Sequence, residues 1–372
     1  MKKRILFIFD RVLHYHQDLF RQLELRLEKH DIELFLLAGE QVAQETGRVA
    51  VAEKTISREQ KYVLQDKRLA GFTFRLPGAY MQDVAEINPD IVVCPAHVGD
   101  IGHWKLIWAK KKYQYKLVAW QCGYEYNAGV LKNFLLGRFM PQFDYHLAYH
   151  SNAKKYALCH GAKENEIKVI HNTINEAKFE CLDKATARKI LRVKHPEIGG
   201  RRVLLFVGAI LKEKRIEQIA EALDLMDRED LLLLIVGDGP YLSKLKEVLC
   251  DRPDVIFTGR VVDGVGAYFD AAEIYVLPGT GGLGINEAMA HSLPVVSGYA
   301  DGSADDLVVD HETGFRLRQG TASELAEKVC HILDDPQLAK NMGETALRRS
   351  KGVFSFDCFL TRVEQALISL VQ

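Results

Sequence analysis

Short apolar runs alternate along this chain with stretches in which apolar residues recur at helical spacing. In the first half, five such runs predict buried parallel strands at residues 5–9, 32–37, 91–93, 117–120 and 167–170. Between the first two runs, Leu19, Leu23 and Leu27 recur every four residues and predict an amphipathic helix. This order of strand, helix and strand predicts a doubly wound α/β sheet.

The same pattern starts again in the second half. Five further runs predict strands at residues 203–207, 231–236, 255–257, 274–277 and 294–297. We therefore expect a first Rossmann-like domain over residues 1–180, a charged linker over 181–201 and a second Rossmann-like domain over 202–350. The amphipathic segment 351–372 predicts a final helix that packs back on the first domain.

Composition supports two globular domains. The chain has 372 residues, of which 48% are apolar and 27% charged, and these proportions are typical of folded proteins. A net charge of -1 argues against a nucleic-acid partner. The charge is uneven, because residues 1–180 carry about +5 and the remainder about -6. The first half is therefore the one suited to an acidic partner or a membrane surface, unless the imbalance is only that of two solvated surfaces.

The N-terminal apolar run is too short for a signal peptide and ends at Asp10 and Arg11, which favours a buried strand. No stretch approaches the roughly 18 apolar residues of a membrane-spanning helix. The seven cysteines include no CxxC pair, which is typical of reduced thiols. We expect a cytoplasmic protein, and any peripheral contact with a membrane would be at its inner face.

Glycine-containing loops follow the predicted strands of the second half. A phosphate group at the carboxyl end of such strands needs exposed backbone N–H groups and a helix N-terminus. In the first loop, Gly208 lets a ligand approach the backbone, and Lys214 and Arg215 supply positive charge where the next helix begins. The alternative interpretation of these two cations is an ordinary solvated helix start.

The loop at residues 279–284 holds four glycines just before a predicted helix that carries Glu287. Its N–H groups are suited to a diphosphate, and Glu287 is suited to sugar hydroxyls. A glycine-rich turn in which Glu287 favours the helix dipole is the alternative, but four glycines cost backbone entropy and favour function. The turn at residues 237–240 lacks the third glycine of a dinucleotide fingerprint, which argues against a nicotinamide dehydrogenase.

Five motifs in the second half occur in an order and spacing that resemble a known family. They are Gly208-Ala209-Ile210 with Lys214, Gly237-Asp238-Gly239-Pro240, Phe257-Thr258-Gly259-Arg260-Val261, Gly282-Leu283 with Glu287-Ala288, and Leu293-Pro294-Val295-Val296. Over about residues 200–350 the chain resembles the retaining glycosyltransferases of family 4. The resemblance implies the GT-B fold, in which two Rossmann-like, doubly wound parallel-sheet domains face a cleft.

The resemblance also implies a donor site. Its residues would be Gly208, Lys214, Arg215, Arg260, Gly281, Gly282, Leu283 and Glu287. In the family pattern, Lys214 would pair with the donor diphosphate, and Gly282 and Leu283 would offer it backbone N–H groups. Glu287 would bind the nucleotide ribose, and Arg260 lies where the family contacts the base.

The sequence departs from the family pattern at three points. At the first, Ala209 replaces a common arginine, and Arg215 is the candidate substitute for it. At the second, Gly279 occupies the position where the E-x7-E motif has its first glutamate. The loop after the central strand of the first domain also lacks the usual histidine. Besides Lys214, the catalytic candidates are therefore His14, His97 and Glu125, which follow predicted strands of the first domain. Exposed loop positions without a catalytic role are the alternative for both histidines.

The resemblance implies transfer of a hexose-type sugar, with retention, from a nucleotide diphosphate sugar to a glycan or lipid-linked acceptor. Surface-polysaccharide or glycoconjugate assembly is the expected setting. We expect no cofactor and no metal requirement, because lysine and helix N-termini can stabilise the leaving diphosphate. The alternatives are a nucleotide-sugar epimerase with the same donor pocket and a nucleotide-sugar-binding pseudoenzyme that regulates a partner. Turnover of a donor would separate an enzyme from the pseudoenzyme.

The basic segment at residues 103–113 is a candidate membrane contact. At helical spacing, Trp104, Ile107 and Trp108 share one face, while Lys105 and Lys112 lie on another. Such a helix can rest on an anionic bilayer, with rings at the headgroups and lysines on phosphates. In the alternative interpretation both tryptophans belong to the core and the lysines form a solvated face.

Overall fold

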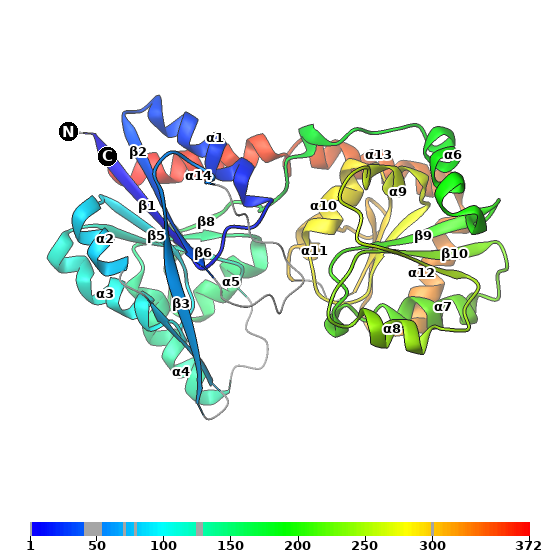
Figure 1. Ribbon diagram of the computed structural model, residues 1–372, viewed down its shortest axis with the longest axis horizontal. Helices are drawn as coiled ribbons and strands as arrows, with labels where there is room; N and C mark the ends of the chain where they lie inside the picture. The colour runs from blue at the N-terminus through cyan, green and yellow to red at the C-terminus, as the bar shows by residue number, and fades with distance from the viewer. Residues whose placement is uncertain (1, 41–53, 70–71, 78–79, 124–128, 299–300) are drawn as a thin grey trace. The chain divides into compact units, whose positions relative to one another are not determined.

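The computed structural model describes residues 2–40, 54–69, 72–77, 80–123, 129–298 and 301–372 (Figure 1). The described residues form two compact units. Unit 1 contains the chain up to Asn172 together with Asp357–Gln372, and unit 2 contains Thr173–Phe356. Each unit is an α/β domain built on a largely parallel sheet, so the predicted fold class is confirmed.

Unit 1 is built on an eight-stranded sheet in the order β4-β3-β2-β1-β5-β6-β7-β8. Its strands are β1 Lys3–Phe9, β2 Ile32–Glu40, β3 Glu59–Leu69, β4 Phe72–Pro77, β5 Ile91–Pro95, β6 Lys116–Gln121, β7 Tyr145–Ala148 and β8 Ile167–Val169. Its helices are α1 His16–Glu28, α2 Tyr80–Ile87, α3 Ile101–Tyr113, α4 Val130–Phe139, α5 Ser151–Cys159 and α14 Phe356–Val371. All neighbouring strands are parallel except β3 and β4, which form an antiparallel pair that the sequence analysis did not predict.

The two faces of this sheet carry different side chains, because successive residues of a strand point to opposite sides. Leu6 and Ile8 of β1 join the core beneath α2, α3 and α4. Phe7, on the other face, packs edge-on against Phe20 of α1 and Trp120 of β6. Both faces of the sheet are therefore buried.

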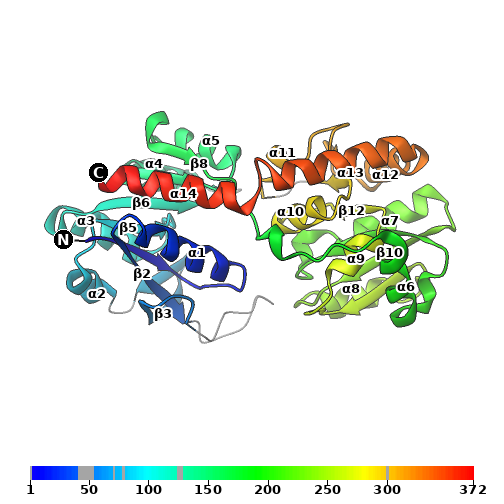
Figure 2. The same ribbon diagram turned by 90° about the horizontal axis from the view of Figure 1, so that it is seen from above.

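Helix α14 covers that second face beside α1, as both ribbon views show (Figures 1 and 2). Phe359 packs edge-on against Trp120 with ring centroids 6.2 Å apart. Arg26 of α1 donates hydrogen bonds to Thr361 and Glu364 of α14, and the Lys116 ammonium donates to the Leu370 carbonyl. The last helix of the chain is thus part of the first unit.

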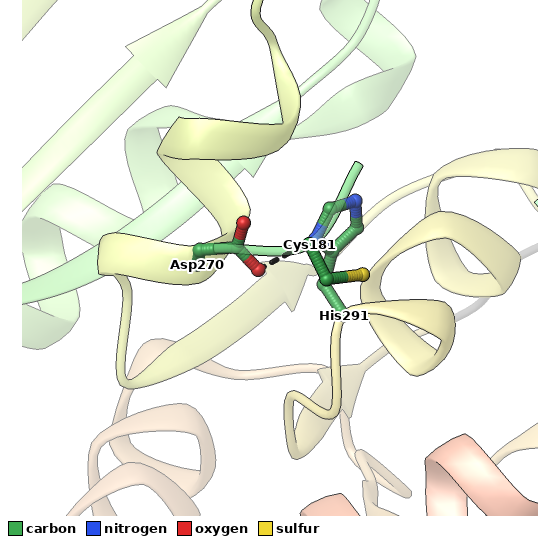
Figure 3. A group of neighbouring side chains, drawn as sticks. All are labelled: Cys181, Asp270 and His291. Carbon is green, nitrogen blue, oxygen red and sulfur yellow. Dashed lines mark hydrogen bonds and ion pairs between the residues drawn. The ribbon is translucent and has the colours of Figure 1, made fainter. Parts of the chain in front are cut away.

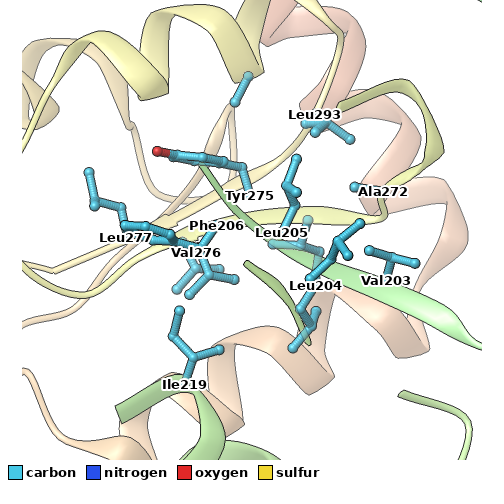
Figure 4. Close-up of a cluster of buried hydrophobic side chains, with 14 of the residues drawn as sticks. Val203, Leu204, Leu205, Phe206, Ile219, Ala272, Tyr275, Val276, Leu277 and Leu293 are labelled. Carbon is cyan, nitrogen blue, oxygen red and sulfur yellow. The ribbon is translucent and has the colours of Figure 1, made fainter. Parts of the chain in front are cut away.

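Unit 2 is built on a six-stranded parallel sheet in the order β11-β10-β9-β12-β13-β14. Its strands are β9 Arg202–Val207, β10 Leu231–Val236, β11 Val255–Gly259, β12 Ile274–Leu277, β13 Val295–Ser297 and β14 Gly314–Arg316. Its helices are α6 Lys184–Lys194, α7 Glu217–Met226, α8 Leu242–Val248, α9 Gly266–Ala271, α10 Leu283–Ala290, α11 Ala304–Leu307, α12 Ala322–Asp334 and α13 Pro336–Lys351. Side chains of β9 and β12, among them Leu204, Phe206 and Val276, form the centre of its core (Figure 4).

The segment 181–201 differs from the linker that the sequence analysis expected. Its helix α6 packs on α9, and Ala187, Leu191 and Ile198 are fully buried in the core of unit 2. Arg188 donates to both carboxylate oxygens of Glu273, which fixes the outer face of the helix. These contacts make the segment part of the second unit, and the chain passes between the units at Asn172 and Thr173 instead.

Candidate functional site

The centre of the unit 2 sheet has the geometry of a ligand site. From β9 the chain adds β10 and β11 on one side, then crosses over to add β12, β13 and β14 on the other. The loops after β9 and β12 therefore diverge from two adjacent strands, at a topological switch point. In open parallel sheets, ligands bind at such a point beyond the carboxyl ends of the strands. Gly208 and Lys214 follow β9, and the glycine-rich loop follows β12.

The two loops are joined by hydrogen bonds between residues distant in the sequence. Lys214 ends a short 3-10 turn, Lys212–Lys214. The backbone N–H of Thr280 donates to the Glu213 carbonyl at 3.0 Å, and the Lys214 ammonium donates to the Thr280 carbonyl. The charge of Lys214 is thus held against the start of the glycine-rich loop, at Thr280 and Gly281.

Gly279 is buried where the two loops meet, and the structure explains why a glycine is there. A side chain at this position would place its Cβ 2.6 Å from the Cα of Lys214, and still closer to the carbonyl oxygen of Glu213. Contacts that short with backbone atoms do not occur, so only glycine lets the turn lie this close. The absence of the family glutamate at 279 therefore follows from the position of the Lys214 turn.

The N-terminus of α10 supplies the backbone N–H groups that the sequence analysis assigned to Gly282 and Leu283. Gly282 is the N-cap, and as a glycine it has no side chain with which to cap the helix. Gly281 precedes it at a φ of 139°, a conformation that favours glycine. The positive end of the helix dipole attracts anions, and Lys214 lies beside this end of the helix.

Two polar residues that sequence reasoning missed lie against the same helix end. A Cβ on Gly282 would lie 2.5 Å from the Ser303 hydroxyl oxygen and nearer still to the Asp301 carboxylate. Asp301 accepts a hydrogen bond from the Ser303 backbone N–H at 3.0 Å. A carboxylate at this helix end offsets part of the positive field of the helix dipole, and Lys214 is a cation that lies beside the same end. Both residues lie in another loop, after β13, and no sequence motif marked them.

Glu287 lies one turn into α10 and is largely removed from water. Loss of hydration raises the pKa of its carboxyl group to about 7, and the nearby His291 opposes this rise. The carboxyl also adds to the rise in the pKa of Tyr275, whose hydroxyl donates to the Val207 carbonyl at 3.2 Å. Glu287 is therefore close to the end of β9, and it changes between a proton donor and a pure acceptor near neutral pH.

The remaining donor candidates are placed around the same edge of the sheet. Gly208 packs directly on Gly237 of the next loop. A Cβ on Gly237 would collide with the carbonyl oxygen of Gly208. Arg260 is exposed just after β11, whose Gly259 carbonyl accepts from the Gly237 N–H at 2.9 Å. Arg215 is exposed, adopts a φ of 53° and has its guanidinium near Gly320. Lys214, not Arg215, is the cation that the structure places at Gly281.

Unit 1 has its own switch point, between β1 and β5. His14 and His97 follow these two strands, and both are exposed. The ring of His97 stacks on His103, with centroids 6.1 Å apart, and the ring of His14 lies edge-on to Tyr15. Glu125, the third candidate of the first domain, lies outside the described residues.

Residues 187–349 match the model of a family described as "Glycosyl transferases group 1". This range holds every donor-site candidate and most of unit 2. The match supports assigning this part of the chain to the group 1 glycosyltransferases.

Curated relatives match over part of the chain. Capsular polysaccharide biosynthesis glycosyltransferase CapM of Staphylococcus aureus is 28% identical over 208 residues, which are 52% of this chain and 53% of the relative. Alpha-monoglucosyldiacylglycerol synthase of Streptococcus pneumoniae is 36% identical over 142 residues, or 36% of this chain and 32% of the relative. The chain thus spans about half or less of the length of these relatives.

Solved structures match over the whole chain. The crystal structure of HepE from Anabaena in complex with UDP has a TM-score of 0.75 and 18% identity, and the alignment covers 99% of this chain and 100% of that one. At this identity the likeness shows the fold alone, and that fold is GT-B.

Proposed function

We propose that this protein is a retaining glycosyltransferase that moves a hexose-type sugar from a nucleotide diphosphate sugar to a glycan or lipid-linked acceptor. One observation carries the proposal. Within the residues that match the group 1 family, the Lys214 ammonium lies against the glycine-rich loop that leads into α10, at the switch point of the sheet. A cation and the backbone N–H groups of a helix N-terminus together suit a doubly charged diphosphate. The match to a structure that contains UDP supports the same ligand class.

The proposed reaction uses these groups on the leaving side. As the bond between the sugar and the diphosphate breaks, negative charge grows on the phosphate oxygens. Lys214 and the N–H groups of Gly282 and Leu283 would stabilise that charge without reorganising. The acceptor hydroxyl attacks from the face that the diphosphate leaves, and its proton passes to a phosphate oxygen.

His14, His97 and Glu125 remain the candidates in unit 1 for orienting the acceptor. The proposal requires no cofactor and no metal in the transfer itself.

A panel of nucleotide sugars and free nucleoside diphosphates tests the proposal. A ligand that binds only the native state raises the melting temperature. We expect at least one diphosphate to do so and its sugar conjugate to be consumed when an acceptor is present. If nothing in the panel raises the melting temperature, the donor site is wrongly placed.

A nucleotide-sugar-binding pseudoenzyme is the second candidate, and Gly279 is the observation that favours it. The buried position leaves no space for the family carboxylate, so one contact with the transferred sugar is missing. Tight binding of a nucleotide sugar without transfer to any acceptor and without hydrolysis would support this candidate over the enzyme.

Glu287 provides a prediction with a pH dependence. If its carboxylate accepts hydrogen bonds from the ribose, donor binding needs the ionised form, which becomes dominant as the pH rises through about 7. Affinity for the nucleoside diphosphate is expected to rise roughly tenfold between pH 6 and pH 8, as the ionised fraction does. Glu287→Gln should bind more weakly and lose this rise. Calorimetry at several pH values measures both, and an unchanged pH profile in the variant would remove Glu287 from the ribose site.

Peripheral membrane contact is part of the proposal, and we propose α4 in place of α3 as the contacting helix. On α3, Ile107 is buried and Trp104 packs on Phe139, with its Nε1 donating to the Val98 carbonyl. The expected lipid-facing row of α3 is therefore wrong for these two residues, and Trp108 alone of the three is exposed. Lys110 is bonded to the Gln142 carbonyl and to Asp144.

Helix α4 exposes a more apolar face. Val130, Leu131 and Phe134 are 90, 61 and 55% exposed, and Leu135 lies beside them. A row of large apolar side chains in water is unusual and marks a contact surface. Arg138 lies over the Phe134 ring, and lysines of the adjoining α3 are exposed. Apolar residues flanked by cations fit the surface of an anionic membrane.

A relative named for synthesis of a glucosyldiacylglycerol supports a lipid-linked acceptor. No helix in the described ranges is long and apolar enough to span a bilayer.

Replacing both Leu131 and Phe134 by serine is expected to weaken binding to anionic vesicles by roughly 100-fold or more, because burying each such side chain is worth about 1.5–3 kcal/mol. Replacing Lys111 and Lys112 by glutamine should weaken it roughly fivefold for each charge. Leu225→Ser, at a similarly exposed leucine of α7, is the matched control. Co-sedimentation with vesicles with and without phosphatidylglycerol measures the effect. Failure of the wild type to sediment at low salt would favour a water-soluble acceptor.

A further inference from the structure

Three side chains of metal-binding types converge in unit 2, outside the loops described above. Cys181 lies in the segment before α6, Asp270 in α9, and His291 directly after α10 (Figure 3). One ligand atom of each lies within 4.8 Å of the other two. In the part of the chain that the structure describes, no other group of three histidine, cysteine, aspartate or glutamate side chains is so close.

Two members of the cluster are buried and rigidly held. The Asp270 carboxylate is 2.7 Å from Nδ1 of His291 through one oxygen and accepts from the Leu182 N–H at 2.8 Å through the other. The imidazole stacks on Phe269 on one side and lies near Phe179 on the other, with centroids 5.2 and 5.6 Å away. A nitrogen and an oxygen donor are therefore fixed in a mostly apolar shell.

His291 is short of one partner. Its Nε2 is buried and has no hydrogen-bond partner within the described residues. An ion held between Asp270 and His291 would bind Nδ1, the nitrogen that faces the carboxylate, so Nε2 is the ring nitrogen that keeps its proton. The missing partner of Nε2 is a cost of this buried position and is no evidence for the ion.

Cys181 closes the cluster from the solvent side. It is exposed, and its sulfur lies 3.8 Å from the Ala290 carbonyl, next to His291 in sequence. An ion can thus reach the buried nitrogen and oxygen from water past the sulfur. A site with three protein ligands and one solvent position has this arrangement.

We propose that Cys181, Asp270 and His291 bind a transition-metal ion of the zinc class. Sulfur, imidazole nitrogen and carboxylate oxygen together favour zinc over magnesium or calcium, which prefer oxygen alone. Nitrogen and oxygen ligands of tetrahedral zinc lie roughly 3.3 Å apart, so Asp270 and His291 need to separate by about half an ångström. On binding, the Cys181 sulfur exchanges its proton for a metal bond and the proton passes to water.

The ion would act on structure, not on sugar transfer. It would join the segment before α6, helix α9 and the end of α10 in one place. His291 lies one turn after Glu287, and its backbone N–H donates to the Glu287 carbonyl at 3.0 Å. Binding of the ion would therefore stabilise the C-terminal end of α10, whose N-terminal end is proposed to bind the diphosphate.

Cobalt is the probe for this site, because a thiolate bound to Co²⁺ absorbs strongly in the near ultraviolet. The full chain, stripped with a chelator, is titrated with Co²⁺, and one ion per chain with a thiolate band is expected. Zn²⁺ should displace it and raise the melting temperature. Cys181→Ser should lose the band and weaken binding by roughly 100-fold or more. Cys250→Ser, at another exposed cysteine of unit 2, should keep both.

Two results would overturn the proposal: no thiolate band in the wild type, or a band that persists in Cys181→Ser. Because Cys181 is exposed, its serine variant is expected to fold, and the melting temperature without metal checks this. The test is separate from sugar transfer. Activity that disappears with EDTA and returns with magnesium would contradict the metal-free transfer and leave the cobalt result unaffected.

Discussion

Replacing Gly279 with glutamate is expected to weaken donor binding severely, although it restores the residue of the family motif. The new Cβ would collide with the backbone of Glu213 and Lys214. The 3-10 turn must then move away from the glycine-rich loop and take the Lys214 charge with it. Overpacking a tight contact costs about 1–3 kcal/mol of stability, and losing the charged contact as well should lower donor affinity roughly 100-fold or more.

Gly200→Glu is the matched control for this substitution. Gly200 is another glycine of unit 2, its φ is not in the left-handed region, and a Cβ there meets no atom within 4 Å. The melting temperature and the dissociation constant for the nucleoside diphosphate are measured for both variants. If Gly279→Glu binds the donor as tightly as the wild type, the backbone contact does not position Lys214.

Lys214→Ala is expected to weaken donor binding roughly 10- to 150-fold, because a hydrogen bond to a charged group is worth about 1.5–3 kcal/mol. The ammonium lies beside Gly281 at the start of α10, and Asp301 there already opposes a second negative charge. Without Lys214, a diphosphate would meet that carboxylate uncompensated. The effect should be present for the free nucleoside diphosphate as well as for the nucleotide sugar.

Lys212→Ala separates this role from a general effect of charge. Lys212 is exposed in the same turn, so its loss removes one cation from the region but none from the glycine-rich loop. Donor affinity and turnover should change little in this variant. Equal losses in the two variants would mean that Lys214 contributes only to the overall field and does not contact the diphosphate.

The strands that the sequence predicted well are those buried on both faces. A run such as 231–236 is apolar throughout, because helices cover both sides of β10. The antiparallel pair of β3 and β4 was missed for the opposite reason. In β3, Gln65, Asp66, Lys67 and Arg68 follow one another, and a strand at the edge region of a sheet can carry such polar residues. Its pairing with β4 is set by contacts that no local pattern shows.

The supposed linker was misjudged because its apolar residues are few. In α6 only Ala187 and Leu191 are buried, one turn apart among charged side chains. For the candidate site, the sequence identified Lys214 and the glycines but not why residue 279 must be glycine, since that contact joins loops after two different strands. The cluster of Cys181, Asp270 and His291 was equally invisible, because the three residues come from distant segments.

The place of α14 gives this protein an unusual order of assembly during translation. The ribosome synthesises the residues up to Asn172 first. At that stage α1 already contacts the sheet face that bears Phe7 and Trp120, but α14, whose Phe359 packs on Trp120, has not yet been made. The rest of that face waits until all of Thr173–Phe356 has been made and α14 follows. Domains usually fold in the order of their synthesis, and an uncovered apolar face is what chaperones and aggregation act on. Here the unit that is made first is the one completed last.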